Sequence, residues 1–341
     1  MGRDRGAPGP TCADSNPARP QRSVRGALDE FVRKSAPHLQ YPGEGGTWQR
    51  FQALAQCAAY DLSLGRLAEG HADALSILRE AGQPISAPAS SYGVWAARAG
   101  RWEMATVATP VRGGWRLSGT KPYCSGSVHL DRALVTAEAP DGYRLFDISV
   151  AEHVAAVASG SWPAVGMADS ESETLSFGGP VLPESAAVGP PDFYLQRPGF
   201  WSGSVGVAAC WYGGAKGLVD ALLDARDHNA GDHALADAGR AVAILAGLAA
   251  FLEHAADAID ADPSDRQHQG HRRALSVREV VHDGCLRVMA LVAAAGGAGP
   301  LCHDRDQSRR AADLFVYLAQ HHGGRDAAAL GRIALDGHGC D

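Results

Sequence analysis

The chain has 341 residues, and its 38 acidic and 31 basic side chains give a formal net charge of −7 when the 14 histidines are neutral. An apolar fraction of 45% is enough for real hydrophobic cores, which excludes a chain that is disordered throughout. The acidic balance and the lack of a Lys/Arg run argue against a nucleic-acid-binding protein, which needs a basic patch to displace counterions from phosphates.

Residues 1–22 are rich in Arg, Pro and Gly and lack the apolar core of a signal peptide, so we predict a disordered leader on a cytoplasmic protein. The seven cysteines are scattered without a CxxC pair, as expected of free thiols in a reducing compartment. The apolar run from Ala241 to Phe251 is shorter than the roughly 20 residues that span a bilayer. No membrane helix is therefore expected.

Three regions with different periodicity predict an α+β protein of several domains. Residues 23–88 show helical spacing of apolar residues and predict a helical domain. Residues 89–190 contain short alternating runs between Gly/Pro turns, which favour a compact antiparallel β-barrel or sandwich. Residues 191–341 return to helical spacing and predict a four-helix bundle. Its helices are expected at Phe200 to Arg226, His233 to Ile259, Arg272 to Ala295 and Ser308 to Gln320, with a short tail at Arg325 to Leu335.

Common catalytic motifs are missing. No GxGxxG follows a strand, no GxSxG is present, and the segment GWRLSGTK carries Thr120 where a P-loop needs Lys. The pairs His268/His271 and His321/His322 lack the partners and spacing of a zinc site, so no metal centre is predicted.

The segment Gly119 to Ser127, GTKPYCSGS, resembles the stretch G-T-K-x-W-I-T-N-G/A of the acyl-CoA dehydrogenase family of flavoproteins. The resemblance implies that Tyr123 lies against the flavin ring and that the Ser125 hydroxyl bonds to its N5/O4 edge. Such a wall and such donors suit a ring that gains negative charge on reduction. The alternative is that the two residues are only a strand-end aromatic and a turn hydroxyl.

Two further segments carry the same resemblance. The stretch YGVWAARAGRW from Tyr92 to Trp102 resembles the family's F-G-L-T-E-P-x-A-G-S-D, which implies that the backbone of Val94 and Trp95 holds the flavin pyrimidine. The family's Thr, Glu and Ser-Asp are replaced there. Gly296 and Gly297 resemble the family's G-G-x-G turn near the ADP part of an FAD that a neighbouring subunit holds.

The position of the catalytic base differs from the family pattern. Arg309 and Asp313 resemble the first Arg and the Asp of R-L-Y-R-D, and eight residues beyond Asp313 the commonest branch has a glutamate that removes the α-proton of the acyl thioester. Here that position is His321, an imidazole that titrates near pH 7. The alternative is a polar residue at a frayed helix end. The family's R-x-x-F-G is lost after Arg226.

Three hypotheses follow. The first is an FAD-dependent oxidoreductase that desaturates an acyl thioester by hydride transfer to flavin N5, with His321 as base, an electron-transfer partner and a homodimeric or homotetrameric assembly. The second keeps the fold but is a monooxygenase that uses reduced flavin and O₂, in which a C-terminal histidine replaces the glutamate. The third is a relative that has lost catalysis and serves as a binding or structural partner.

Overall fold

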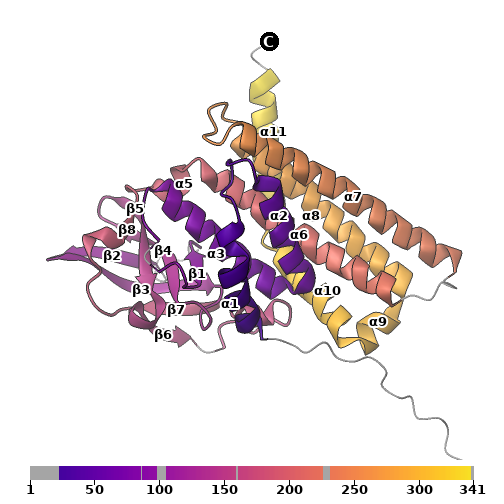
Figure 1. The fold of residues 1–341 in the computed structure, drawn as a ribbon, viewed down its shortest axis with the longest axis horizontal. Coiled ribbons are helices and arrows are strands. Elements are labelled where there is room, and N and C mark those ends of the chain that lie inside the picture. Colours follow the sequence, from indigo (N-terminus) through magenta and orange to yellow (C-terminus); the bar gives the residue numbers. More distant parts are fainter. Residues whose placement is uncertain (1–22, 86, 98–104, 159, 226–230, 339–341) are drawn as a thin grey trace, which may run out of the picture.

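The computed structural model describes residues 23–85, 87–97, 105–158, 160–225 and 231–338. Helices come first along the chain, a sheet follows, and a second group of helices ends it (Figure 1). The predicted leader, residues 1–22, lies outside the described residues, as do Arg98 to Trp102 of the second family-like segment.

The first group consists of α1 (Val24–Lys34), α2 (Thr47–Tyr60) and α3 (Leu62–Glu80). Asp61 separates the last two with an extended backbone, and its carboxylate accepts a hydrogen bond from the Leu64 amide at 2.9 Å. This is an N-cap, which satisfies one of the free amides at the start of α3 and lets two helices follow each other without a loop.

The sheet has eight strands in the order β6-β7-β3-β2-β4-β5-β8, and β1 pairs with β4 beside this path. The strands are β1 (Tyr92–Trp95), β2 (Thr106–Val111), β3 (Gly114–Cys124), β4 (Arg132–Ala139), β5 (Gly142–Ser149), β6 (Val154–Ala158), β7 (Glu173–Phe177) and β8 (Ala187–Val188). Gly113 and Gly114 turn the β2–β3 hairpin with φ of 91° and 143°, values that favour glycine.

The predicted closed antiparallel barrel is not confirmed. The outer strands β6 and β8 do not pair with each other, so the sheet is open. Both β1 and β2 run parallel to β4, and β2 touches it at a single register pair, Val107 with Glu138. One edge of β4 is therefore shared, with β1 along its first half and β2 near its end.

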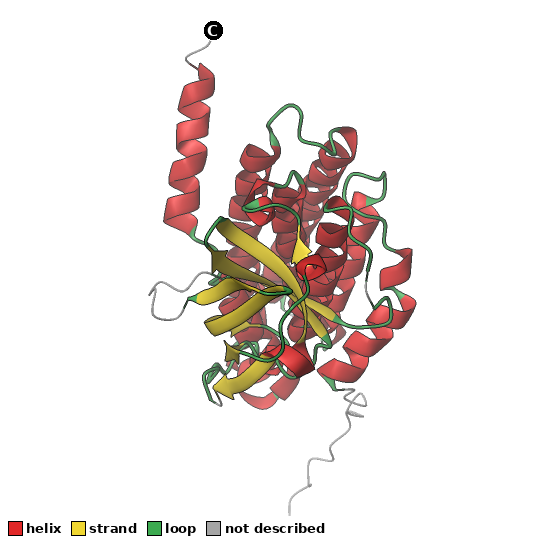
Figure 2. Ribbon diagram, turned by 90° about the vertical axis from the view of Figure 1, so that its left-hand side faces the viewer, coloured by secondary structure: helices red, strands yellow, loops and turns green. Residues whose placement is uncertain are grey.

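The second helical group begins with α5 (Phe193–Gln196) and continues through α6 (Gly199–Asp224), α7 (Asp232–Ala261), α8 (Gly270–Gly296), α9 (Ala298–His303), α10 (Arg305–Leu318) and α11 (Gly323–His338). The long helices α6, α7 and α8 pack on one another, α2 joins them, and α10 packs on α6. Helix α11 contacts α8 and extends away from the body (Figure 2).

Helix α7 is the one element in the described part of the chain that is long and apolar enough to cross a membrane, by length and composition alone. Within the fold it packs on α6, α8 and α2. Only 28% of its most apolar window is buried, so much of its apolar surface faces outward.

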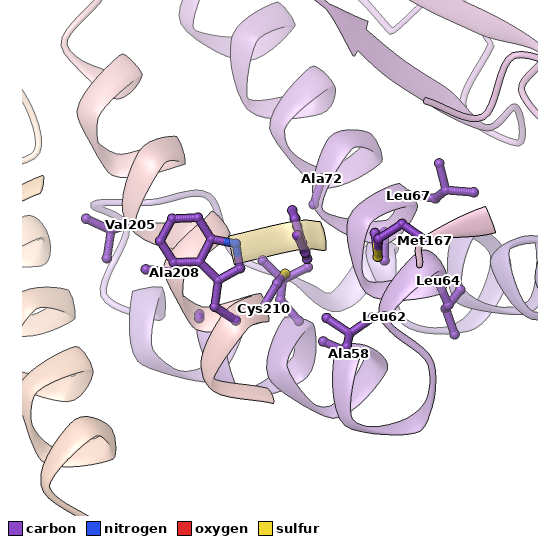
Figure 3. Packing of buried hydrophobic residues seen from close by; sticks show 14 of the residues in the cluster. Ala58, Leu62, Leu64, Leu67, Ala72, Met167, Val205, Ala208 and Cys210 are labelled. Atoms are coloured by element: carbon purple, nitrogen blue, oxygen red, sulfur yellow. The ribbon is translucent and has the colours of Figure 1, made fainter. Parts of the chain in front are cut away.

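One continuous hydrophobic core joins the helices of both groups to the sheet. Figure 3 shows part of it, where residues of α2, α3 and α6 meet Met167 from the segment before β7. Helices approach closely here because glycines face backbone: a Cβ on Gly213 of α6 would lie 2.2 Å from the carbonyl oxygen of Ala55 in α2. The core therefore fixes α6 against both α2 and α3.

Candidate functional site

Tyr123 lies on a bulge of β3. The pairing of β3 with β7 shifts register between Lys121 and Cys124, and Tyr123 takes a left-handed backbone with φ of 59°. Its ring is 64% exposed. An exposed aromatic in a backbone region that side chains rarely adopt is a strained arrangement, and such strain is common at functional sites. The side chain is therefore accessible to a ligand.

Ser125 faces inward. Its Oγ lies 2.8 Å from the Oγ of Ser172, which lies 3.0 Å from the Oγ of Ser170, and Ser170 donates to the Met167 carbonyl at 2.7 Å. The Ser125 carbonyl accepts a hydrogen bond from Trp95 Nε1 at 2.9 Å. Its hydroxyl thus belongs to a chain of three buried serines that fixes the segment before β7.

Among the described strands, β1 pairs only with β4, so its other edge has no strand partner there. The Tyr92 amide donates to His71 Nδ1 of α3 at 3.1 Å, on the side away from β4. Strand residues alternate, so the Val94 amide also faces away from β4, whereas the Trp95 carbonyl accepts from Thr136 of β4 at 3.4 Å. Val94 therefore offers a backbone donor at this edge, and the fully buried Trp95 side chain supports it from inside.

Gly296 and Gly297 end α8. Gly297 has a left-handed φ of 66° and leads directly into α9, and a Cβ on it would meet nothing within 4 Å. The two glycines lie at the far end of α8 from His321, whose partner Glu279 is near the start of that helix. Within one chain they do not join the other predicted residues.

His321 follows the end of α10, and its side chain is 1% exposed. Its Nε2 lies 2.8 Å from Glu279 Oε2 on α8. Its Nδ1 lies 3.9 Å from Asp326 Oδ2 and has no hydrogen bond within the described residues. With its proton on Nε2, the ring donates a hydrogen bond to the Glu279 carboxylate, and this bond fixes the orientation of the ring. The other nitrogen, Nδ1, is then the one that can exchange a proton.

Aromatic and cationic groups surround this histidine. We call Trp211, Arg278, His282, Tyr317 and His321 the Trp211 cluster. The His282 ring centroid lies 4.6 Å from that of His321. The Trp211 side chain is fully buried. Its ring forms T-shaped pairs with the rings of His282, Tyr317 and His321. The Arg278 guanidinium lies over the Trp211 ring, 4.5 Å from its centroid. The cluster joins α6, α8 and α10.

Helix α3 connects this cluster to the sheet. His71 Nδ1 accepts a hydrogen bond from the Tyr92 amide of β1. Burial lowers the pKa of His71 to about 4, so the ring stays neutral and Nδ1 can accept this bond. One turn earlier Arg66 binds Glu69 at 2.7 Å, and both interact electrostatically with Tyr317. Burial raises the pKa of Glu69 to about 7, although Arg66 opposes the shift.

Asp313 of the family-like motif has a structural role. Its Oδ1 accepts the Met167 amide at 2.6 Å, and its Oδ2 lies 3.5 Å from Arg309. Arg309 also binds Asp61 between α2 and α3 at 2.7 Å. The contacts of Asp313 and Arg309 connect α10 to the segment before β7 and to the α2–α3 junction. They therefore fix the position of α10 and of His321, which follows its end.

A cavity of about 940 Å³ lies elsewhere, between α9, α10, the α2–α3 junction and the segment before β7. Charged side chains of both signs line it, among them Asp61, Asp169, Glu171, Arg305 and Arg309. None of the site residues predicted from the sequence lines this cavity. Its size alone does not make it the reaction site.

Sequence reasoning missed Glu279 and Arg278. They lie about 40 residues before His321 on another helix, where they read as ordinary charged residues of a helical repeat. A faint signal existed in Trp211, one of several aromatics in the first long helix of the bundle. No spacing rule links these positions, because only the packing of α6, α8 and α10 brings them together.

No protein-family model matches the chain, and no curated protein matches it significantly. Solved structures do match. A complex of TdsC, the dibenzothiophene monooxygenase from Paenibacillus sp. A11-2, with FMN and indole gives a TM-score of 0.75 at 18% identity, over 92% of this chain and 95% of that one. Methanesulfinate monooxygenase MsuC from Pseudomonas fluorescens gives 0.73 at 16% identity, over 92% and 96%.

XiaF from Streptomyces sp., solved with FADH2 and glycerol, gives a TM-score of 0.67 at 17% identity, over 90% of this chain and 94% of that one. These neighbours have the acyl-CoA dehydrogenase-like fold; TdsC and MsuC are described as monooxygenases, and TdsC and XiaF were solved with a flavin. The chain shares that fold. The predicted fold resemblance is thus supported, and the flavin bound in the neighbours is FMN or FADH2 rather than FAD in particular.

Proposed function

We propose that the chain is a flavin-dependent monooxygenase, the second of the three hypotheses. The observation that carries this proposal is His321, a buried imidazole held by Glu279 at the position where the resemblance places a dehydrogenase glutamate. The monooxygenase neighbours support the same choice. Desaturation of an acyl thioester now ranks second, because His321 stands at the sequence position where the resemblance places the carboxylate base.

The residues present fit a flavin. The exposed Tyr123 ring offers a flat wall, and the Val94 amide is a donor on the unpaired edge of β1. Ser125 and Trp95 hold this wall in place through the Trp95 Nε1 bond. Gly296 and Gly297 would contact a flavin only if a second copy of the chain held it. The cofactor is proposed as a flavin, with FAD and FMN both open to the test below.

When bound, reduced flavin would supply two electrons to O₂, so that one oxygen atom enters the substrate and the other leaves as water. The chain must then hold the substrate, exclude bulk water and deliver protons. Glu279 orients the His321 ring, and Nδ1 is buried, lies 3.9 Å from Asp326 Oδ2 and has no hydrogen bond within the described residues. His321 would therefore act as the proton donor and acceptor in a site largely closed to solvent.

The test is an oxygenation assay with paired histidine variants. Reduced FMN or FAD, supplied by a separate reductase, is combined with ¹⁸O₂ and a panel of heteroaromatic and sulfinate substrates, and the label is measured in the products. His321→Ala should lose about 10²–10⁴-fold in rate, and Glu279→Gln should shift the pH profile. His322→Ala, an exposed neighbour, is the matched control.

Two results would count against the proposal. Full activity in His321→Ala would remove the histidine from the chemistry. Bleaching of bound flavin by an acyl-CoA under anaerobic conditions, without label incorporation under ¹⁸O₂, would restore the dehydrogenase hypothesis.

A further inference from the structure

We propose that Arg278, Trp211 and Arg66 form a subsite that receives an oxyanion group of the substrate, of the carboxylate or sulfonate class. This inference rests on the proposed function, because it assigns a substrate class to the same site. It starts from Arg278, whose guanidinium lies over Trp211 and donates one hydrogen bond, from Nη1 to the Ser204 carbonyl at 3.3 Å.

Arg278 lacks a carboxylate partner. Within the described residues no carboxylate oxygen lies within 4 Å of its guanidinium, and burial lowers its pKa. The arginines of the neighbouring network differ, since Arg66 binds Glu69 at 2.7 Å and Arg197 binds Asp73 at 3.2 Å. Asp326 and Glu69 act on the Arg278 guanidinium only from beyond contact distance. Because a buried cation that is not paired at contact is costly, an anion that binds there is favoured.

Two buried N–H groups of this region, on Trp211 and Arg66, have no hydrogen-bond acceptor within the described residues. Trp211 Nε1 is fully buried and has no hydrogen-bond partner within the described residues, and Arg66 Nε is in the same state. Both groups can only donate. The Cys210 thiol lies 3.6 Å from the Gly65 carbonyl oxygen, so the residues that directly precede Trp211 and Arg66 are in contact, and Arg278 lies over the Trp211 ring. A ligand that satisfies these donors must bring acceptors.

The nearby carboxylates are already engaged. Glu69 is paired with Arg66, Glu279 with His321, and Asp326 lies 3.3 Å from Arg325. None of them neutralises Arg278 at contact distance. The Trp211 ring covers one face of the guanidinium, which leaves its edge to form paired hydrogen bonds with a two-oxygen group. A carboxylate or a sulfonate has that shape.

The test measures ligand binding to flavin-free protein by calorimetry, so it needs neither oxygen nor turnover. The probes are two isosteric pairs, benzoate with benzamide and benzenesulfonate with benzenesulfonamide. The wild-type chain should bind each anion at least tenfold more tightly than its neutral partner. Arg278→Met should lose about 10–100-fold for the anions and nothing for the amides.

Three further variants control the result. Arg278→Lys keeps the charge and should retain most of the preference for anions, whereas Trp211→Phe removes one donor and should weaken it several-fold. Arg287→Met, on an exposed site of the same helix, should leave it unchanged. If Arg278→Met does not fold, the lysine and phenylalanine variants decide.

Three results would overturn the proposal. The first is equal affinity for each anion and its amide, and the second is no binding of any of the four probes. The third is unchanged anion affinity in Trp211→Phe and Arg278→Met. Loss of oxygenation with anion binding intact would instead count against the proposed function. The two failures are therefore distinguishable.

Discussion

Some residues of the family-like motifs stabilise the fold, and others are available to a ligand. Their exposure and hydrogen bonds distinguish these two roles. Asp313 is 2% exposed and holds the Met167 amide, so it serves structure. Tyr123 is mostly exposed in a strained backbone, so its ring adds little to the core. The sequence pattern placed both in the family motif but could not distinguish these roles, because it contains no information on exposure.

Asp313 makes stability depend on pH. Burial raises its pKa to about 6 from 3.8, so the folded state disfavours its ionised form. This cost is fully present above pH 6 and disappears as the pH falls towards 4. Asp313→Asn keeps an acceptor for Met167 and should stabilise the fold at pH 8 by up to about 3 kcal/mol, and much less at pH 4.5. Urea denaturation at the two pH values measures this difference.

The control for Asp313→Asn is Asp306→Asn, an exposed site on the same helix, which should change stability by less than about 0.5 kcal/mol at either pH. A loss of stability in Asp313→Asn that is larger at pH 8 than at pH 4.5 would contradict this expectation and show that the Arg309 and Met167 contacts need the charge.

Tyr123 should contribute to flavin binding and not to folding. Tyr123→Gly relieves the left-handed backbone, which costs a non-glycine residue about 1 kcal/mol, and should leave the melting temperature unchanged or raise it. The same variant should weaken flavin binding at least tenfold, while Tyr123→Phe retains it. Unchanged flavin affinity in Tyr123→Gly would remove this residue from the cofactor site.

At the scale of elements, periodicity predicted the long helices well. The expected helix at His233 to Ile259 is Asp232–Ala261 in the structure, and that at Arg272 to Ala295 is Gly270–Gly296. Strands β1, β6 and β8 and helix α9 were missed, because they have two to six residues and too few positions for a period to emerge. Barrel closure was also wrong, since closure depends on which edges pair.

The site was predictable only in part, for the same physical reason. Tyr123 and His321 could be predicted as site residues because each lies in a local motif, and their roles stay predictions. The contact between His321 and Glu279 depends on how α8 and α10 pack, as does the stacking of Arg278 on Trp211. Such contacts between distant residues leave no pattern in one sequence.

Close packing of α6 on α2 should depend on Gly213. An added Cβ there would lie 2.2 Å from the Ala55 carbonyl oxygen, so backbone must move. Gly213→Ala should destabilise the fold by about 1–3 kcal/mol or more. Gly247→Ala on α7 is the matched control, because nothing lies within 4 Å and helix propensity should add about 0.5–1 kcal/mol. Thermal unfolding of both variants compares them, and equal stabilities would contradict this packing.

At the scale of the whole molecule, the outward apolar face of α7 is the main unexplained surface. Leu235 and Val242 lie seven residues apart on one face of α7 and are 50% and 46% exposed. A second copy of the chain could cover this stripe. We therefore propose self-association through α7, in line with the expected homodimer or homotetramer.

Val242→Arg should shift the chain towards monomer in sedimentation velocity, because a charge in an apolar interface must be desolvated. Val181→Arg, an exposed apolar residue on the sheet side, should have no effect. A wild-type chain that is monomeric at all concentrations would contradict self-association.

Binding of reduced flavin tests the central claim most directly, because the catalytically degenerate alternative predicts none. Purified protein is titrated anaerobically with reduced FMN and FAD, and in parallel with the oxidised forms, with Tyr123→Gly as the control. The monooxygenase proposal predicts saturable binding of a reduced flavin that is tighter than binding of its oxidised form and weaker in the variant. No binding of either form of either flavin would contradict it.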